Sequence, residues 1–534
     1  MSTIINTATL KPSDGTPLDR HQIYCGLDSC VTLEVHSTIK KQLDPDTQLI
    51  YNFERALQAP VLEMDLRGIL TDGYEVSRLM HIYDNRKERI YSIIQRYAMV
   101  VWGAALNPGS HKQLKEFFYD EMKIPRIYKF EKGERKLTVN RDALTQIQQY
   151  RYARPIAIAV LAYRDMAKKI GVLKSGIDED ERMRFSWNIG GTNTGRFSCN
   201  ENVFGGGTNS QNITDELRKI FYADEGMKFA YLDLAQAESR LTAYVSGDEA
   251  YISACESEDL HTAIAKLIWP ELDWSSGHNR NPAADREVAD KKFWRHWSYR
   301  DISKRGGHLS NYIGSPEANA KKLNISVETA KRFQQLYFKA FPGIRRMHTD
   351  VARELQTTAI LTTPLGRRRL FFGRNYEDDI LRKGVAYRPQ SAVADILNLG
   401  LWRVWRETLG SKTMWLQTRG EEPTPYNPPT TDLARIVLLS QLHDAILIQY
   451  PDDPATERRV IARAIELMTI PVRVTDIRLR GALTREMVIP VDATVGWNWA
   501  KASKSNPDGL VSFGKNSERV RQVSPSTDLL QRIM

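Results

Sequence analysis

Cysteine is scarce in this sequence, which has only four in 534 residues. Cys25, Cys30, Cys199 and Cys255 form no CxxC pair, and no histidine lies at a spacing typical of a zinc site. Neither a disulfide framework nor a zinc centre is therefore expected. Reduced thiols in an intracellular, cytoplasmic protein are predicted instead.

Long apolar runs and targeting segments are lacking as well. The longest apolar run, at 156–163, is far shorter than the roughly 20 residues needed to span a bilayer. The opening residues MSTIINTATLKPSDG lack the basic start and the apolar core of a signal peptide. The stretch GGTNTGRFS is not closed by Gly-Lys-Ser/Thr and is no P-loop. These absences predict no membrane partner and no Walker-type nucleotide site.

The composition is that of an ordinary globular protein, with 42% hydrophobic and 26% charged residues. A chain of this length can bury several cores, so several domains are expected. Lys and Arg number 75 against 65 Asp and Glu, which gives a net charge of +10. This excess suits a polyanionic partner but does not require one.

Hydrophobic periodicity divides the chain into regions of different character. Helix-rich sequence runs to about residue 180, and a glycine-heavy, loop-like stretch covers 186–214. A short strand, KFAYLDL, then precedes a helix expected at 235–245. The later patterns predict a Trp- and His-rich insertion at 269–301, helices to about 357, a hairpin at 359–373 with its turn at 364–366, a proline-rich loop at 418–432 and a polar tail at 505–528.

Two carboxylates stand at the ends of apolar strands. In IVLLSQLHDAILIQYPDD, residues 436–453, two β-rich runs flank His443 and Asp444, which predicts a hairpin with both at its bend. Asp233 ends the strand KFAYLDL. Two acids on adjacent strand tips would suit a pair of divalent cations, because a metal pair stabilises in-line phosphoryl displacement. From the residues alone, two unrelated turn aspartates remain the alternative.

A basic face is predicted between these two acids. In WSYRDISKRGGHLSNYIGSP, Arg300, Lys304, His308 and Tyr312 recur every four positions and share one face of a helix. Two fixed cations there would suit a triphosphate, whereas a solvated basic face is the alternative. The pair of glycines at 306–307 costs roughly 1 kcal/mol of helix propensity each, so the close approach of a ligand or another backbone is expected.

Three segments together resemble the motifs of family A DNA polymerases, the class of bacterial DNA polymerase I and many phage replicative enzymes. LDLAQAESRLTAYVSGDE resembles the first palm motif, YRDISKRGGHLSNY the fingers helix and QLHDA the second palm motif. Flanking segments, including ERALQAPVLEMDLRGILTD, NTGRFS, DLHTAIA, TPLGRRRL and PQSAVADIL, match in order from about residue 50 to 503. The resemblance implies an α+β right-hand fold with an antiparallel-sheet palm and a mostly helical thumb and fingers.

The resemblance also implies a role for each matching residue. Asp233, Asp444 and the Leu234 carbonyl would bind two Mg²⁺ ions, for which Mn²⁺ could substitute, and Lys304 would join the two acids in catalysis. The residues implied for the nucleotide are Arg300, Lys304, His261, His308, Tyr312, Gln236 and Glu238, the last of which would exclude a ribose 2′-hydroxyl. The residues implied for the primer-template are Arg196, Gln211, Asn212, Gln390, Gln441, His443, Arg367 and Arg368.

Three positions depart from the family pattern. Ala445 stands where a glutamate usually follows His-Asp, so the second palm motif supplies one acid fewer. His308 occupies a position usually held by Phe or Tyr, and Ile313 separates Tyr312 from the glycine that usually follows it directly.

A further likeness lies near the N-terminus. Tyr24 and Asp28, in YCGLD, resemble the last motif of the family's 3′–5′ exonuclease. A helix with a stray aspartate is the alternative. Because only 23 residues precede Tyr24, the other exonuclease carboxylates have no sequence to occupy. We expect the exonuclease domain to be largely missing, so that this chain does not proofread. The exonuclease is then either lost or a separate subunit that completes the site.

The expected organisation follows from these matches. The predicted regions are an exonuclease remnant or extension at 1–45, a connecting helix and thumb at 46–185, palm at 186–265 and 390–503, fingers at 266–389 and a polar tail at 504–534.

The implied activity is attack of a primer 3′-hydroxyl on the α-phosphorus of a dNTP. We expect a monomeric, phage-type replicative DNA polymerase acting in an infected bacterial host. A gap-filling or lesion-bypass polymerase remains an alternative, and Ala445 leaves open a catalytically weak, polymerase-like DNA-binding protein. Glu238 disfavours an RNA polymerase.

Overall fold

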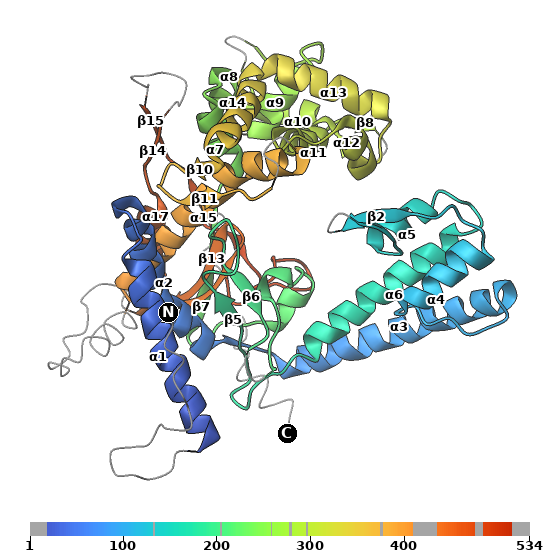
Figure 1. Ribbon diagram of the computed structural model, residues 1–534. Coiled ribbons are helices and arrows are strands. Elements are labelled where there is room, and N and C mark those ends of the chain that lie inside the picture. Colours follow the sequence, from blue (N-terminus) through green and yellow to red (C-terminus); the bar gives the residue numbers. More distant parts are fainter. Residues whose placement is uncertain are drawn as a thin grey trace.

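The computed structural model describes residues 19–131, 134–202, 205–257, 259–276, 280–294, 297–373, 377–408, 435–475 and 484–514. Figure 1 shows a central sheet, a helical lobe above it and a long helical arm that extends to one side. Within the described ranges, no helix is long and apolar enough to cross a membrane. The expected proline-rich loop at 418–432 and most of the expected polar tail lie outside these ranges.

An antiparallel sheet of five strands forms the centre, in the order β12-β13-β7-β16-β17. Strand β7 lies in the middle although its neighbours come from much later in the chain. The expected strand ending in Asp233 and the expected hairpin around His443 and Asp444 are both present. The strands are β7 (Met227–Leu234), β12 (Val437–Leu442), β13 (Ala445–Pro451), β16 (Val491–Gly496) and β17 (Val511–Ser512).

Three long helices pack with this sheet and with one another: α2 (Pro45–Arg67), α15 (Asp378–Arg406) and α17 (Pro454–Met468). Each of α2 and α17 begins with proline after an aspartate cap, which is a typical helix start. Their apolar side chains and those of the strands form the largest core of the described residues. This core holds the sheet rigidly and therefore positions the residues at the strand ends.

The arm consists of α3 (Gly73–Val101) and α6 (Arg154–Leu173), which pack against each other along their length. Its tip has a separate core that includes Ile94, Phe117 and Ile156. The first turns of α3 instead join the central core. The elements at the tip are α4 (His111–Lys115), η2 (Glu116–Glu121), β2 (Tyr128–Glu131), β3 (Glu134–Leu137) and α5 (Arg141–Ile147).

The helical lobe has its own core, which begins earlier in the chain than the expected boundary at residue 266. Ala243, Tyr251 and Leu260 already pack in it, together with Phe333 and Tyr337. The link from sheet to lobe is α7 (Ala237–Ser246). The lobe contains α8 (Glu249–Cys255), α9 (Leu260–Ile268), α10 (Pro282–Asp290), α11 (Tyr299–Asn311), α12 (Pro316–Leu323) and α13 (Val327–Ala340).

The expected boundary between residues 389 and 390 falls inside a single helix. The first part of α15 packs with α14 (Pro342–Thr358) and with the hairpin β10–β11 in a small core of their own. The rest of α15 joins the central core, and Pro389 lies within the helix. The expected hairpin at 359–373 is present as β10 (Ile360–Thr362) and β11 (Arg368–Leu370).

Short elements connect these parts. They are β1 (Ile69–Leu70), β4 (Arg182–Met183), β5 (Ser186–Asn188), β6 (Ser198–Asn200), η3 (Ser210–Asn212), η4 (Leu217–Ile220), β8 (Lys292–Trp294), β9 (Trp297–Ser298), β14 (Val472–Thr475) and β15 (Thr484–Met487).

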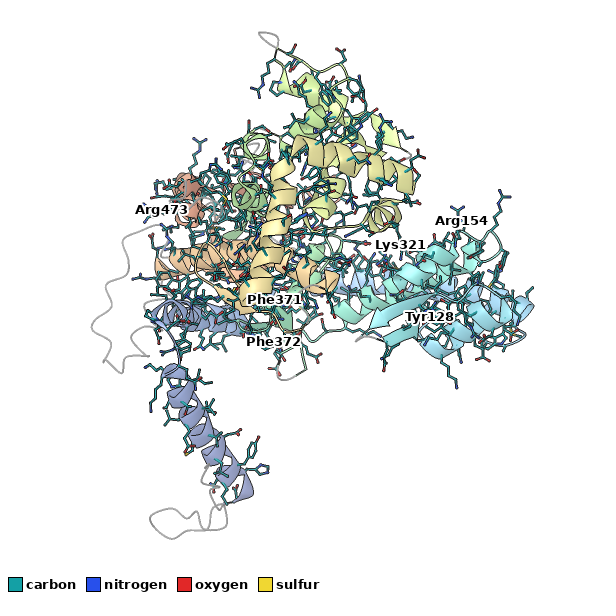
Figure 2. All side chains as sticks on the ribbon, turned by 45° about the horizontal axis from the view of Figure 1, so that its top comes forward. Tyr128, Arg154, Lys321, Phe371, Phe372 and Arg473 are labelled. Carbon is teal, nitrogen blue, oxygen red and sulfur yellow. The ribbon has the colours of Figure 1, made fainter. Side chains whose placement is uncertain are left out.

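Helix α1 (Arg20–Lys40) extends away from the rest of the molecule in Figure 2, and only His36 near its end contacts α2, through the Tyr51 hydroxyl, among the interactions of its described side chains. Tyr24 is 66% exposed, and Asp28 is exposed as well. The two residues of the exonuclease-like motif therefore lie on one isolated helix.

Two glycines in α11 are explained by packing against aromatic side chains rather than by a ligand or another backbone. A Cβ atom built on Gly306 would lie 2.6 Å from the ring of Phe333, and one on Gly307 would lie 3.2 Å from Tyr337. Both rings come from α13 in the lobe core. The glycines let α11 approach α13 closely, which corrects the expectation drawn from the sequence.

We expect Gly306→Val to lower the free energy of unfolding by about 1–3 kcal/mol, because the added methyl groups overpack against Phe333. Gly171→Val is the control, since Gly171 lies in α6 and a Cβ there has no atom within 4 Å. This second change should be neutral or slightly stabilising. Chemical unfolding of both variants measures the difference, and equal effects would contradict the packing explanation.

Candidate active site

The sheet register brings the two strand-tip acids together. Asp233 on β7 is paired across the sheet with Ala445 on β13, the residue directly after Asp444. The Leu234 amide donates a hydrogen bond of 2.9 Å to the Asp444 carbonyl. His443 adopts a left-handed backbone conformation with φ of +51°, which lets β12 turn back at once into β13. Two carboxylates far apart in sequence thus stand beside each other.

A third acid that the sequence analysis missed lies in the same row of the sheet. Asp492 on β16 is the register partner of Asp233 on the side opposite Ala445. Directly opposed residues of an antiparallel pair point to the same face. The signal was present in IPVDATVG, an acid inside an alternating strand, but only the strand order shows which residue it faces.

Negative charge accumulates at this end of the sheet, where Asp233, Asp444 and Asp492 lie close together. Burial, followed by the negative charges of Asp444 and Asp492, raises the pKa of Asp233 to about 6. Burial also raises the pKa of Asp444, although Arg196 opposes the shift. Ionised carboxylates that repel one another in a partly dry site favour binding of a cation.

The donor set fits Mg²⁺, which binds one or two protein carboxylates and fills its remaining positions with water and substrate phosphate oxygens. Asp233 and Asp444 would hold the ions, with the Leu234 carbonyl at the same strand end. Among the described residues, no group of three or more His, Cys, Asp or Glu side chains is arranged to hold a metal ion. Substrate oxygens and water would therefore complete the coordination.

Glu238 links the acids of the sheet to the helical lobe. It lies in the first turn of α7 and accepts hydrogen bonds from Arg196 and, at 2.8 Å, from the Tyr312 hydroxyl. The same Arg196 nitrogen lies 3.3 Å from Asp444. His308 packs edge-on against Tyr312 with ring centroids 4.8 Å apart. Five of the residues expected from the sequence therefore form one connected group.

Gln236 stands between the strand tip and this group. Its φ of +55° is left-handed, so α7 begins at Ala237 rather than at the expected residue 235. Its side-chain oxygen is buried and has no hydrogen-bond partner.

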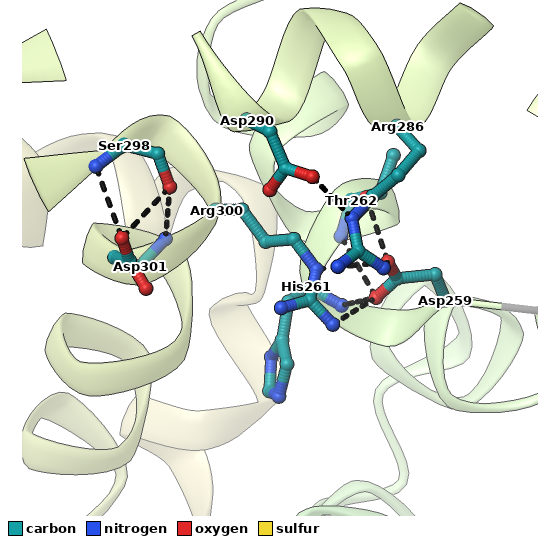
Figure 3. Close-up of polar contacts among 8 residues, drawn as sticks. All are labelled: Asp259, His261, Thr262, Arg286, Asp290, Ser298, Arg300 and Asp301. Atoms are coloured by element: carbon teal, nitrogen blue, oxygen red, sulfur yellow. Dashed lines mark hydrogen bonds and ion pairs between the residues drawn. The ribbon is translucent and has the colours of Figure 1, made fainter. Parts of the chain in front are cut away.

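A cationic cluster lies on the lobe. Arg300 in α11 donates two hydrogen bonds, of 2.9 and 3.2 Å, to Asp259 at the start of α9 (Figure 3). Although burial alone would raise it, Arg300 lowers the pKa of Asp259 to about 2. Lys304, one turn further along α11, is exposed. Arg300 and Lys304 thus share a face of α11, as the spacing indicated.

His261 lies beside these cations and is neutral at pH 7. Burial, followed by the charges of Arg300 and Lys304, lowers the pKa of His261 to about 4. Its Nδ1 atom is buried without a hydrogen-bond partner. It can therefore donate to or accept from a ligand without adding charge.

Two arginines of the β10–β11 hairpin form ion pairs within the chain, Arg367 in the interior and Arg368 at the surface. Arg367 is only 9% exposed and forms ion pairs with Asp395 and Glu54. Arg368 pairs with two acids at the start of α2, the cap residue Asp44 and Asp46 in the first turn. Arg367 thus connects the hairpin to α15 and α2, and its buried guanidinium is engaged by two carboxylates rather than presented for the expected DNA contact.

Other expected DNA contacts differ in their exposure. His443 is exposed at the hairpin turn, and Gln390 is partly exposed on α15. Gln441 is 1% exposed and donates to Asn398, so in this conformation it faces the protein interior. Gln211 donates to the Phe197 carbonyl at 3.1 Å, and the neighbouring Asn212 ends the same short 3₁₀ turn.

The inserted residue after Tyr312 has a local consequence. Ile313 adopts φ of +57°, which is rare for a β-branched residue. The Gly314 amide donates to the Leu309 carbonyl at 2.8 Å, and a Cβ atom on Gly314 would lie 2.8 Å from that carbonyl oxygen. The glycine is displaced by one position, yet it still closes the end of α11.

Comparison with known sequences defines the class of the protein. The sequence profile of DNA polymerase family A matches residues 77–283 and 296–501, which is more than half of the chain. The chain therefore belongs to DNA polymerase family A.

Individual relatives agree with this assignment. DNA polymerase I of Chloroflexus aurantiacus is 24% identical over 91% of this chain and 47% of its own length. The thermostable DNA polymerase I of Thermus thermophilus is 24% identical over 93% of this chain and 54% of its own length. The chain thus spans about half the length of the curated relatives it matches.

A solved structure shares the fold. The polymerase domain of Pol1 from M. smegmatis, in complex with DNA primer-template and dNTP, superimposes with a TM-score of 0.67 at 23% identity. The match covers 88% of this chain and 74% of that domain's chain. The α+β right-hand polymerase fold expected from the sequence is thereby confirmed.

We expect Asp233→Asn to raise the free energy of unfolding at pH 7 by about 1–3 kcal/mol in the absence of divalent metal. The pKa of Asp233 is raised in the folded state, so its ionisation destabilises that state progressively as the pH rises from about 4 to about 6. The gain should disappear at pH 3, where the Asp233 carboxyl is protonated in both the folded and the unfolded state. Added Mg²⁺ should stabilise the unmodified chain but not the variant, and equal melting temperatures at pH 7 would contradict this.

Asp492→Asn should lower the pKa of Asp233, because one of the negative charges that raise it is removed. The pH below which Mg²⁺ binding is lost should then fall. The fall should be less than about one pH unit, because Asp492 is exposed and its charge is screened by solvent. Titration calorimetry between pH 5 and 7.5 measures this midpoint. Glu88→Gln, an exposed acid of α3, serves as the control. An unchanged pH profile for Asp492→Asn would refute the electrostatic role.

Proposed function

We propose that this chain is a template-directed DNA polymerase that adds dNTPs to a primer 3′-hydroxyl. The observation that carries the proposal is the placement of Asp233 beside Asp444, linked through Arg196, Glu238 and Tyr312 to the cationic helix α11. Support comes from membership of family A and from the solved relative, whose complex contains primer-template DNA and dNTP.

The strand-tip acids provide the reaction centre. Mg²⁺ bound there would supply Lewis-acid activation of the attacking hydroxyl and neutralise charge on the phosphates. Asp233 and Asp444 contribute by remaining ionised, and the sheet register keeps them side by side without a conformational change. The Arg196 nitrogen near Asp444 offsets part of the negative charge until substrate arrives.

The lobe provides the nucleotide site. Arg300 and Lys304 neutralise the triphosphate, and neutral His261 supplies a hydrogen bond. The hydrogen bond from the Tyr312 hydroxyl to Glu238 connects the lobe to the sheet at the edge of this site. The Glu238 carboxylate, fixed by this bond beside the sugar of the incoming nucleotide, disfavours a ribose 2′-hydroxyl and so selects deoxyribonucleotides.

One feature favours a second candidate, a polymerase-like DNA-binding protein of low activity. Ala445 is fully buried and adds no carboxylate beside Asp233. Two acids nevertheless meet the requirement of Mg²⁺ for one or two protein carboxylates, so polymerisation is the better-supported function.

The biological role and the partners are finer predictions. Replication of phage DNA in an infected host, gap filling and lesion bypass differ in the number of nucleotides added per binding event, so processivity on a long template distinguishes them. The absence of proofreading, a separate exonuclease subunit around Asp28 and a monomeric state also stay predictions. Exposed Tyr24 and Asp28 on α1 are accessible to such a subunit.

Extension of a 5′-labelled primer on a DNA template with Mg²⁺ tests the proposal. We expect extension by the unmodified chain and a loss of at least about 1,000-fold in Asp233→Ala and in Asp444→Ala, because each change removes a catalytic charge. Glu88→Ala is the matched surface control. Retained DNA binding without any extension by the unmodified chain would support the second candidate instead.

The same assay without dNTPs tests the exonuclease prediction. The primer should remain intact with the purified chain. Sustained degradation that Asp28→Ala leaves unchanged would refute the interpretation of α1 as an exonuclease remnant.

A further inference from the structure

A helix that lies mostly outside the family match places a cation beside Asp259 and Arg300. The family profile matches up to residue 283 and resumes at residue 296, and most of α10 lies in the gap. Arg286 of this helix donates a hydrogen bond of 2.7 Å to Asp259 Oδ2. Arg300 donates to the same oxygen at 2.9 Å, and Figure 3 shows both guanidinium groups converging on it.

Helix α10 is held firmly against the lobe. Its start is capped by Asn281, and buried Asp285 pairs with Lys266 of α9 at 2.9 Å and accepts from the Ser275 amide. Asp290 in the next turn binds the Nε of Arg286 at 2.7 Å. The Arg286 side chain is thus directed toward Asp259 by contacts on both sides.

The cluster carries more positive than negative charge. Arg286 and Arg300 share one acceptor oxygen of Asp259, so their donor nitrogens lie no farther apart than two hydrogen bonds. Asp290 is the second acid of the cluster, because it pairs with Arg286 from the other side. Lys304 adds a third cation on α11. All three charges contribute to the low pKa of His261. Guanidinium groups this close repel one another unless an anion neutralises them, so the cluster favours a polyvalent anion.

Space for an anion is present on the Arg286 side. A cavity of about 560 Å³ is lined by three cations, Lys266, Arg280 and Arg286, and by two acids, Asp259 and Asp285. This volume exceeds that of several water molecules. A phosphate group can therefore approach Arg286 without displacing the backbone.

We propose that Arg286 is a further triphosphate-binding residue, and that Asp259 is a counter-ion that both arginines release when the nucleotide arrives. The inference rests on the proposed polymerase function. Arg286 binds the terminal phosphates of the incoming dNTP and the pyrophosphate product, whereas Arg300 and Lys304 are the two cations that the family pattern implies. A structural connection between α10 and α9 is the competing explanation.

Steady-state kinetics of Arg286→Gln tests the proposal. We expect the KM for dNTP to rise about tenfold while kcat changes less than about twofold, because a charge-assisted contact to the substrate is lost. In the reverse reaction, the KM for inorganic pyrophosphate should rise by a similar factor. Arg286→Lys should restore part of the affinity, since it keeps the charge but loses the two-pronged geometry.

Arg332→Gln is the matched control, because Arg332 is an exposed arginine of α13 in the same lobe. It removes the same charge at a distance from Asp259. The proposal would be overturned if Arg286→Gln changed the KM values for dNTP and pyrophosphate no more than Arg332→Gln does. A lower melting temperature with unchanged KM would also overturn it and would establish the structural connection.

A binding measurement separates this inference from the proposed function. Calorimetric titration of dATP with Mg²⁺ into the full chain needs no primer and no turnover. Weaker binding by Arg286→Gln, with unchanged binding by Arg332→Gln, would support the inference even if no variant extended a primer. Unchanged dATP binding by Arg286→Gln in a chain that does extend primers would refute the inference alone.

Discussion

The antiparallel pairing of β7 with β13 is the constraint on which the rest of the site depends. It places Asp233 opposite Ala445 and therefore beside Asp444. A one-residue slip would turn Asp233 to the other face of the sheet, because side chains alternate along a strand. Apolar side chains of both strands are buried in the central core, and β13 contacts α15 and α17, which makes such a slip costly. Hydrophobic burial thus fixes the distance between two repelling charges.

The site has an excess of negative charge at the sheet and an excess of positive charge at the lobe. At the sheet, burial and the charges of Asp444 and Asp492 raise the pKa of Asp233. At the lobe, by contrast, three cations (Arg286, Arg300 and Lys304) meet two acids, Asp259 and Asp290. Glu238 lies at the junction and is held from both directions, by Arg196 and by Tyr312. Under the proposed function, metal ions are complementary to the negative excess at the sheet and a triphosphate is complementary to the positive excess at the lobe.

The departures from the family pattern are accommodated locally. Ile313 takes a left-handed conformation so that Gly314 can still close α11. Helix α10, most of which the family profile leaves unmatched, packs on α9 and places Arg286 against Asp259. Ala445 fits because it is buried in the row that Asp233 and Asp492 occupy. Each change alters the surroundings of the site while leaving the central sheet intact.

The sequence by itself determined the local elements and the types of residue they carry. Apolar alternation ending in Asp233, the hairpin bend at Asp444 and the four-residue spacing in α11 are short-range signals, and motif order identified the family. Contacts between distant segments were decided only by the tertiary structure. Arg367, which the resemblance implied for the primer-template, is buried on Asp395, and the position of Asp492 beside Asp233 follows only from the strand order. Such partners depend on how buried surfaces pack, a long-range property that no local pattern encodes.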